Sequence, residues 1–196
     1  MSESPIYKVV LVGDGNVGKT SLVRRFCEGK FEDSRILTIG VDFQIKAVQL
    51  GEREVRLSIW DVAGQDRFRT FRDQFYSGTL AVALVYDVTA PATFFNLPRW
   101  REEVMASAPG APMVVICNKL DLGPVVPPGE VEGWAKFEGR MPFLQTSALT
   151  GENIEQFFQG LAYLAYKHKE ALVEIEKMRA QYLPPSGPPS GLPSGS

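Results

Sequence analysis

A glycine-rich stretch that ends in a lysine and a threonine carries the clearest chemistry in this sequence. It reads Gly13-Asp14-Gly15-Asn16-Val17-Gly18-Lys19-Thr20, and Ser21 follows. The spacing G-x-x-x-x-G-K-[ST] is typical of a loop whose backbone N–H groups surround phosphate oxygens, because glycine lets the chain curl tightly. The Lys19 ammonium can contact the outer phosphates, and the Thr20 hydroxyl can bind Mg²⁺. The stretch therefore predicts a site for the phosphates of a nucleotide.

The segments on either side of this loop have the patterns that such a site requires. Residues Ile6–Val12 are mostly apolar and rich in β-branched side chains, which predicts a buried strand. Residues Ser21–Glu28 have apolar side chains at helical spacing. A strand, a glycine loop and a helix thus follow one another in the necessary order. The amino end of the helix would add its positive dipole end to the site.

A second group of polar residues follows another predicted strand. The sequence Trp60-Asp61-Val62-Ala63-Gly64-Gln65 contains the pattern D-x-x-G. A carboxylate at a strand end can hold Mg²⁺ through its water shell, so Asp61 is a candidate metal residue. The amide of Gly64 can approach a terminal phosphate because no side chain intervenes. The Gln65 amide can orient an attacking water molecule.

Two further motifs predict which base is bound. Asn118-Lys119-Leu120-Asp121 has the pattern N-K-x-D, and Ser147-Ala148-Leu149 follows the last predicted strand. The Asp121 carboxylate can accept two parallel hydrogen bonds from N1–H and the 2-amino group of guanine. Adenine lacks this donor pair, and a site that leaves buried polar groups unpaired rejects a ligand strongly. A backbone N–H of the second motif can bind the guanine O6 atom.

Strand-like and helix-like patterns alternate along the chain. Predicted helices begin near Lys19, Arg67, Ala92, Gly129 and Asn153, and predicted strands are Ile6–Val12, Val41–Leu50, Glu54–Asp61, Leu80–Asp87, Met113–Asn118 and Pro142–Thr146. This alternation predicts an α/β fold with a mostly parallel six-stranded sheet and helices on both faces. Residues 49–53 form a turn between adjacent strands, so one antiparallel strand is expected at the sheet edge. The motif residues then lie at strand ends, where open α/β sheets bind ligands.

Length and composition limit the possible classes of protein. The 196 residues suffice for one domain, which we predict over 6–180 with an extended C-terminal helix, after an extension at 1–5 and before a disordered Pro/Ser/Gly-rich tail at 181–196. The formal net charge of -2 gives no electrostatic case for nucleic acid. Cys27 and Cys117 are expected to be buried, reduced thiols. With no membrane-spanning stretch and no signal peptide, a cytoplasmic protein is expected.

Together the motifs resemble those of the Ras superfamily of small GTPases, over roughly residues 6–169. Within that superfamily the chain is most similar to the Rab family, at residues 38–43, 60–65, 67–70 and 86–87. The resemblance implies a P-loop G domain that binds GTP or GDP with Mg²⁺ and hydrolyses GTP slowly. It also implies that loss of the γ-phosphate loosens two switch segments, so that effectors bind in the GTP state.

The resemblance further implies a role for each matching residue. Phosphates would be bound by residues 13–21, with Lys19 at the β- and γ-phosphates, and Gly64 would sense the γ-phosphate. Mg²⁺ would be bound by Thr20 and Thr38, and by Asp61 through water. Gln65 would position the hydrolytic water. Guanine would be held by Phe31, Asn118, Lys119, Asp121 and the Ser147–Leu149 segment, chiefly Ala148.

Partners are implied in the same way. Rab proteins expose an aromatic triad to effectors, and here it would be Phe43, Trp60 and Phe75. Tyrosine is usual at the third position, so the choice of effector is expected to differ. An exchange factor and a GTPase-activating protein are further expected partners, and the chain is expected to be a monomer.

Two residues depart from the common Rab pattern. Gly15 stands where many Rab proteins have serine; it leaves room for the arginine of an activating protein, or simply permits the loop's backbone, and both can hold. Arg35 stands three residues before Thr38, where tyrosine is common. This R-x-x-T spacing resembles that of heterotrimeric G-protein α subunits, whose arginine neutralises transition-state charge. Arg35 is therefore either a catalytic arginine finger in cis or a solvated surface arginine.

Several alternatives stay open on the sequence alone. No cysteine lies near the C-terminus, so the prenylation site usual in Rab proteins is not encoded in the chain as it stands. The protein could then be soluble, truncated, or without that membrane system, and it would meet membranes through partners. A role in vesicle traffic rests on family analogy. One rival function is a P-loop ATPase or nucleotide kinase, which Asn118–Asp121 disfavours. Another is a GTP-bound interaction module without turnover, which Thr38, Gly64 and Gln65 disfavour.

Overall fold

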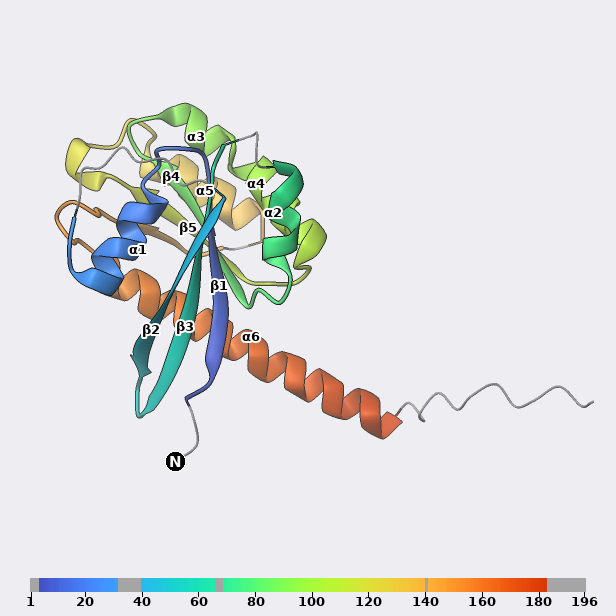
Figure 1. Ribbon diagram of the computed structural model, residues 1–196. Coiled ribbons are helices and arrows are strands. Elements are labelled where there is room, and N and C mark those ends of the chain that lie inside the picture. Colours follow the sequence, from blue (N-terminus) through green and yellow to red (C-terminus); the bar gives the residue numbers. More distant parts are fainter. Residues whose placement is uncertain (1–3, 32–39, 66–68, 140, 183–196) are drawn as a thin grey trace, which may run out of the picture.

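The computed structural model describes residues 4–31, 40–65, 69–139 and 141–182 (Figure 1). Strands and helices alternate along most of the chain, as the sequence predicted. In chain order they are β1 Ile6–Val12, α1 Lys19–Glu28, β2 Val41–Leu50, β3 Arg53–Val62, α2 Arg69–Tyr76, β4 Ala81–Asp87, α3 Pro91–Phe95, α4 Leu97–Ser107, β5 Met113–Asn118, the short 3₁₀ helix η2 Leu120–Leu122, α5 Pro128–Phe137, β6 Phe143–Gln145 and α6 Ile154–Tyr182.

A six-stranded sheet organises the molecule, with strand order β2-β3-β1-β4-β5-β6. Strand β2 runs antiparallel to β3 at the edge, and every other neighbouring pair is parallel. The predicted α/β fold with one antiparallel edge strand is therefore confirmed. In the parallel part, Leu11 pairs with Asp61, and Asp87 pairs with Asn118. The polar residues at these strand ends consequently share one edge of the sheet.

Helices cover both faces of the sheet, because the inner strands alternate their side chains between two cores. Strand β4 is buried at all seven positions, as a central parallel strand requires. One core joins the sheet to α1 and α6, and we call it the α1/α6 face. The other joins the sheet to α2, α3, α4 and α5, and we call it the α2–α5 face.

Glycines bound the helix that follows the phosphate-loop sequence. Gly18 precedes α1 with φ of 94°, and Gly29 ends it with φ of 68°. Both values lie in the left-handed region that glycine adopts without steric cost. The Gly29 N–H donates to the Arg25 carbonyl and so satisfies a backbone group at the helix end.

Helix α6 is the longest element, with 29 residues, and Figure 1 shows that it runs past the sheet and projects beyond it. Its first half buries a stripe at i, i+3, i+4 spacing that includes Phe157, Phe158 and Leu161. Residues 174–179 are all exposed. The predicted tail lies almost wholly outside the described residues.

Two expectations need correction. The helix expected from Ala92 is two helices, α3 and α4, because Pro98 in the first turn of α4 has no N–H to continue the preceding helix. Cys117 is buried as predicted, but Cys27 is only partly buried. Cys27 lies in the last turn of α1, next to the exposed residues Glu28 and Gly29.

Candidate functional site

The glycine loop after β1 packs closely against neighbouring backbone. Gly13 has φ of 143°, and an added Cβ would lie 2.1 Å from the Val85 carbonyl oxygen. An added Cβ at Gly18 would lie 2.3 Å from Asn118 Nδ2. Any side chain at either position would be both strained and in collision. These two glycines therefore hold the loop against β4 and against the first residue of the N-K-x-D motif.

Lys19 lies inside this loop, with only 6% of the residue exposed. Its ammonium donates hydrogen bonds to the carbonyl oxygens of Gly13 (2.7 Å) and Asp14 (2.8 Å). Burial lowers the pKa of Lys19 to about 8, although the carboxylates of Asp61 and Asp14 oppose that shift. A positive charge in such low-dielectric surroundings attracts an anion more strongly than one in water.

A hydroxyl and a carboxylate meet next to this lysine. Thr20, the second residue of α1, donates a hydrogen bond from Oγ1 to Asp61 Oδ2 near the end of β3. Asp61 is buried. Hydroxyl and carboxylate oxygens are hard ligands of the kind that Mg²⁺ prefers, and Mg²⁺ is commonly held by one or two carboxylates together with substrate phosphates. These side chains thus fit the predicted metal.

The D-x-x-G segment lies directly on the glycine loop. A Cβ at Gly64 would lie 2.4 Å from both the Gly13 carbonyl oxygen and the Asp14 carbonyl carbon. A Cβ at Gly15 would lie 4.0 Å from Gln65 Cγ, an ordinary contact distance. The structure therefore brings Gln65 to face the loop across Gly15, and it leaves no room for a side chain at Gly64.

Asn118 connects three of the predicted motifs. Its side-chain Nδ2 donates to the Val17 carbonyl oxygen at 2.8 Å. Its Oδ1 accepts hydrogen bonds from Thr146 Oγ1 at 3.3 Å and from the Ala148 N–H at 3.4 Å. Asn118 is buried, so these bonds satisfy a polar side chain that would otherwise be costly to bury. The glycine loop, β5 and the Ser147–Leu149 motif are thereby held together.

The other residues of N-K-x-D lie at the open edge of the site. Lys119 has φ of 67°, and its ammonium lies 2.6 Å from Asp87 Oδ2. Burial alone would raise the pKa of Asp87, but hydrogen bonds from Lys119 and Thr89 outweigh it and lower the pKa. Asp121 is exposed, and it accepts a hydrogen bond from Ser147 Oγ. An exposed carboxylate that a neighbouring side chain holds in place is well suited to accept hydrogen bonds from a nucleotide base.

Comparison with known proteins identifies this arrangement of motifs. A sequence model described as the Ras family matches residues 8–167. The chain belongs to the Ras family. It is 37% identical over 190 residues to the Ras-related protein Rab-7a of Dictyostelium discoideum, across 93% of this chain and 94% of that protein. It is 42% identical over 165 residues to the Ras-related protein SEC4 of Saccharomyces cerevisiae, across 83% of this chain and 76% of that protein. It is 40% identical over 174 residues to the Ras-related protein Rab7 of Pisum sativum, across 84% of each chain.

The family and these Rab relatives confirm the predicted activity. The chain is a Rab-like small GTPase that binds GTP and GDP, switches between the two states and hydrolyses GTP. Rab-type GTPases interact with effectors, exchange factors and activating proteins, and the same general kinds of partner apply to this chain. The rival readings as an ATPase, a nucleotide kinase or a module without turnover find no support.

The remaining predicted residues of this GTPase are placed less centrally. Phe31 is partly buried and packs against the α1/α6 core, Ser21 lies within α1, and Leu149 is half exposed. Arg35 and Thr38 lie outside the described residues.

Reasoning from sequence missed a set of side chains on α2 and α4. Both carboxylate oxygens of Asp14 accept hydrogen bonds from the α3–α4 region, one from Asn96 Nδ2 and one from Trp100 Nε1, each at 2.7 Å. Arg72 of α2 is fully buried and donates to the carbonyl oxygens of Ala63 and Gln65. The only sequence signal was Asp14 itself, a carboxylate in a loop that needs only backbone N–H groups.

The rings of the predicted aromatic triad lie next to one another across three elements. Phe43 of β2 is 56% exposed and stacks on Trp60 of β3 with ring centroids 5.4 Å apart. Phe75 of α2 lies 6.1 Å from Trp60. The Lys8 ammonium lies 4.1 Å from the centre of the Trp60 ring, which is a cation–π contact. Trp60 is therefore held in place by contacts on several sides.

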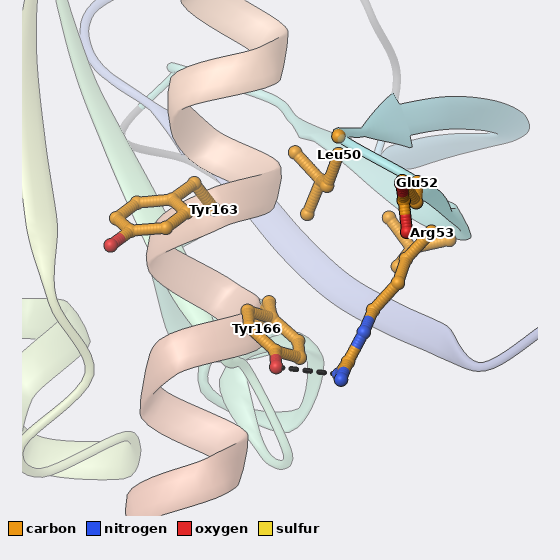
Figure 2. Close-up of a pocket in the computed structure, with 7 residues that line it drawn as sticks. Leu50, Glu52, Arg53, Tyr163 and Tyr166 are labelled. Carbon is orange, nitrogen blue, oxygen red and sulfur yellow. Dashed lines mark hydrogen bonds between the residues drawn. The ribbon is translucent and has the colours of Figure 1, made fainter.

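A pocket of about 450 Å³ lies elsewhere, between the β2–β3 turn and α6 (Figure 2). Arg53 Nη1 donates a hydrogen bond to Tyr166 Oη at 2.7 Å, and Figure 2 marks this bond with a dashed line. The pocket is lined by Leu50, Gly51, Glu52, Arg53, Val55, Tyr163 and Tyr166. None of these belongs to a nucleotide motif, and the turn is at the opposite end of β3 from Asp61.

Across the described ranges, no helix has the length and apolar character needed to cross a membrane.

Proposed function

We propose that this Rab-like GTPase binds Mg²⁺ and guanine nucleotide through the residues at the carboxyl edge of its sheet, and that it acts as a switch in membrane traffic. The observation that carries the proposal is the meeting of four separate motifs at that edge. Lys19, Asp61, Asn118 and Ala148 each come from a different motif, and the contacts described above bring these motifs together.

The phosphates would be held by the backbone of residues 13–20 and by Lys19. The Lys19 ammonium now bonds two carbonyl oxygens of its own loop, and phosphate oxygens are stronger acceptors because they carry charge. Thr20 and Asp61 would supply oxygen ligands to Mg²⁺, and Thr38 would add another. When bound, the metal neutralises negative charge on the β- and γ-phosphate oxygens.

The base would be selected by Asp121. Its carboxylate is exposed at the rim and already accepts one hydrogen bond from Ser147, which limits its orientation. The Lys119 side chain, drawn toward Asp87, would lie along the base, and the Ala148 N–H would bind O6. Phe31 would cover the guanine and ribose.

Hydrolysis would depend on a water molecule positioned by Gln65, which faces Gly15 of the phosphate loop. The arginine-finger hypothesis for Arg35 is tested by single-turnover hydrolysis with Arg35→Ala. A fall of tenfold or more, equal to about 1.4 kcal/mol in the barrier, supports a catalytic arginine. An unchanged rate supports a solvated arginine.

Effectors would bind to Phe43, Trp60 and Phe75. The support is the row of three neighbouring rings, of which Phe43 is exposed and Trp60 and Phe75 are partly buried, because exposed apolar side chains are common in protein interfaces. We further propose a cytoplasmic monomer that reaches membranes through its partners, in line with the Rab names of its relatives.

A nucleotide competition experiment with Asp121→Asn tests the proposed site. The side-chain amide of asparagine would donate to the C2 carbonyl of xanthine, whereas opposite guanine its oxygen could accept one hydrogen bond but its NH₂ group would face the 2-amino donor. We expect GDP affinity to fall by about 100-fold, which corresponds to about 2.7 kcal/mol, and xanthosine diphosphate to become the preferred ligand. Glu132→Gln, a surface carboxylate on α5, is the matched control and should leave both affinities unchanged. Equal competition by ATP and GTP in the wild type would contradict the proposal.

A further inference from the structure

Trp100 of α4 touches both halves of the hydrolytic site, although it belongs to no nucleotide motif. Its side chain is completely buried. The edge of the indole contacts the phosphate loop, and the face of the indole contacts α2. A single rigid ring therefore lies between two segments that must be aligned for catalysis.

The edge contact holds the phosphate loop. Trp100 Nε1 donates to Asp14 Oδ1 at 2.7 Å, and Asn96 Nδ2 donates to Asp14 Oδ2 at 2.7 Å. Both carboxylate oxygens of Asp14 thus point toward the α3–α4 region, where they do not compete with a phosphate anion for the hydrogen-bond donors of the loop. The carbonyl of the same residue accepts a hydrogen bond from the Lys19 ammonium at 2.8 Å. The position of Asp14 therefore bears on the position of Lys19.

The face contact holds the segment that carries Gln65. The Arg72 guanidinium lies 4.3 Å from the centre of the Trp100 ring. Its Nη1 donates to the Gln65 carbonyl oxygen at 2.9 Å and to the Ala63 carbonyl oxygen at 3.3 Å. The backbone on both sides of Gly64 is therefore tied to a single buried cation.

The guanidinium is itself held in one orientation. Nε and Nη2 of Arg72 donate to the two carboxylate oxygens of Glu103 at 2.7 and 2.8 Å, and Tyr76 Oη donates to the same carboxylate at 2.7 Å. The side chains of Arg72 and Glu103 are only 1% and 6% exposed. Such a buried pair often adds little net stability over apolar residues of similar volume, so its geometric effect is the more informative property.

We propose that Trp100 and Arg72 form a positioning bridge that aligns the Gln65 segment with the phosphate loop, a role that rests on the proposed function of Gln65. Trp100 sets the loop through Asp14, and Arg72 sets the backbone of Ala63 and Gln65 against the same ring. Neither residue touches the nucleotide in this scheme. Both act through residues that do, so each arm of the bridge should affect a different kinetic step.

Two variants separate the two arms. Trp100→Phe keeps an aromatic face for Arg72 but removes the N–H that Asp14 accepts. The triple variant Arg72→Met/Tyr76→Phe/Glu103→Leu removes the guanidinium, the Glu103 carboxylate and the Tyr76 hydroxyl together, so that neither charge of the ion pair is left buried without the other. Trp134→Phe on α5, a partly buried tryptophan packed against the same core, is the control for removing an indole N–H. Thermal unfolding establishes that each variant is folded.

The readouts are GTP hydrolysis in a single turnover and release of a fluorescent GDP analogue. Trp100→Phe should speed GDP release at least fivefold, and Trp134→Phe should change it less than twofold. The triple variant should slow hydrolysis at least tenfold with GDP release within threefold of wild type. Combining Trp100→Phe with the triple variant should give both defects in one protein, faster GDP release and slower hydrolysis, because each arm acts on a different kinetic step.

Opposite results overturn the bridge. If the folded triple variant hydrolyses GTP at the wild-type rate, the proposed role of Arg72 is wrong. If Trp100→Phe releases GDP at the wild-type rate, the proposed role of Trp100 is wrong. Gln65→Leu distinguishes this failure from failure of the proposed function. If Gln65→Leu slows hydrolysis and the triple variant does not, the bridge alone is wrong. If Gln65→Leu hydrolyses GTP at the wild-type rate, the role of Gln65 and the bridge fail together.

Discussion

The two faces of the sheet are built from different chemistry. On the α1/α6 face, helices pack through apolar rings and aliphatic chains, and the stacked pair Phe26 and Phe158 lies in the middle with centroids 4.1 Å apart. On the α2–α5 face, an apolar core surrounds buried polar groups, namely the Arg72–Glu103 pair and the indole N–H that binds Asp14. Among the residues that the structure describes, the same strands thus support one face on which no such buried network is seen and one face that has it.

This difference indicates a division of roles. Apolar packing is nondirectional and tolerates small displacements, whereas hydrogen bonds and bidentate ion pairs lose strength steeply when their geometry changes. Side chains of the α2–α5 face bind the Asp14 carboxylate and the carbonyl oxygens of Ala63 and Gln65. We infer that the α1/α6 face mainly stabilises the domain, and that the α2–α5 face also transmits the position of one catalytic segment to another.

The largest expected effect on stability comes from the apolar face. Phe158→Ala should lower the free energy of unfolding by about 3–5 kcal/mol, because a completely buried ring is replaced by a cavity. Urea unfolding of the GDP-bound protein measures this loss. GTP hydrolysis by the folded fraction should stay within twofold of wild type. A tenfold loss of hydrolysis at full occupancy of the folded state would contradict the proposed division of roles.

Tyr76→Phe should have a smaller effect on stability and a larger one on activity. It removes one hydrogen bond to the Glu103 carboxylate and leaves the bidentate Arg72 contact in place. We expect a loss of about 1.5–3 kcal/mol, as for hydrogen bonds to charged groups. Hydrolysis in a single turnover should slow by threefold or more.

Tyr163→Phe is the control for this change, because Tyr163 is exposed on α6. It should alter stability by less than about 0.5 kcal/mol and leave hydrolysis unchanged. Equal effects of the two substitutions on hydrolysis would argue against a special role for the polar face.

Much of this architecture could be predicted from the sequence because its signals are local. The burial of β4 follows from seven consecutive apolar or aromatic residues before Asp87, and the site motifs each occupy a few neighbouring residues at a strand end. The polar network of the α2–α5 face has no such signal. Asp14 is 86 residues from Trp100, and Arg72 is 31 residues from Glu103. Their pairing depends on how α2 and α4 pack on the sheet, which hydrophobic periodicity does not specify.

The two cysteines allow the faces to be compared within one molecule. Cys27 of α1 lies at the α1/α6 core, and Cys117 of β5 lies in the α2–α5 core. Burial raises the pKa of each thiol to about 11, so only about one thousandth of either thiol is ionised at pH 8. Because the thiolate is the reactive form, alkylation of the partly exposed Cys27 by iodoacetamide should rise about tenfold per pH unit between pH 7 and 9.

Cys117 is only 1% exposed, so its alkylation requires local opening of the α2–α5 face. A ligand that binds only the closed state lowers the population of the open state by the factor 1 + L/Kd, where L is the free ligand concentration. Saturating GDP should therefore slow alkylation of Cys117 by tenfold or more and that of Cys27 by less than twofold, as measured by mass spectrometry of each peptide. Equal protection of both cysteines would mean that the faces open as one unit, and the nucleotide site would then be coupled to the apolar face as strongly as to the polar one.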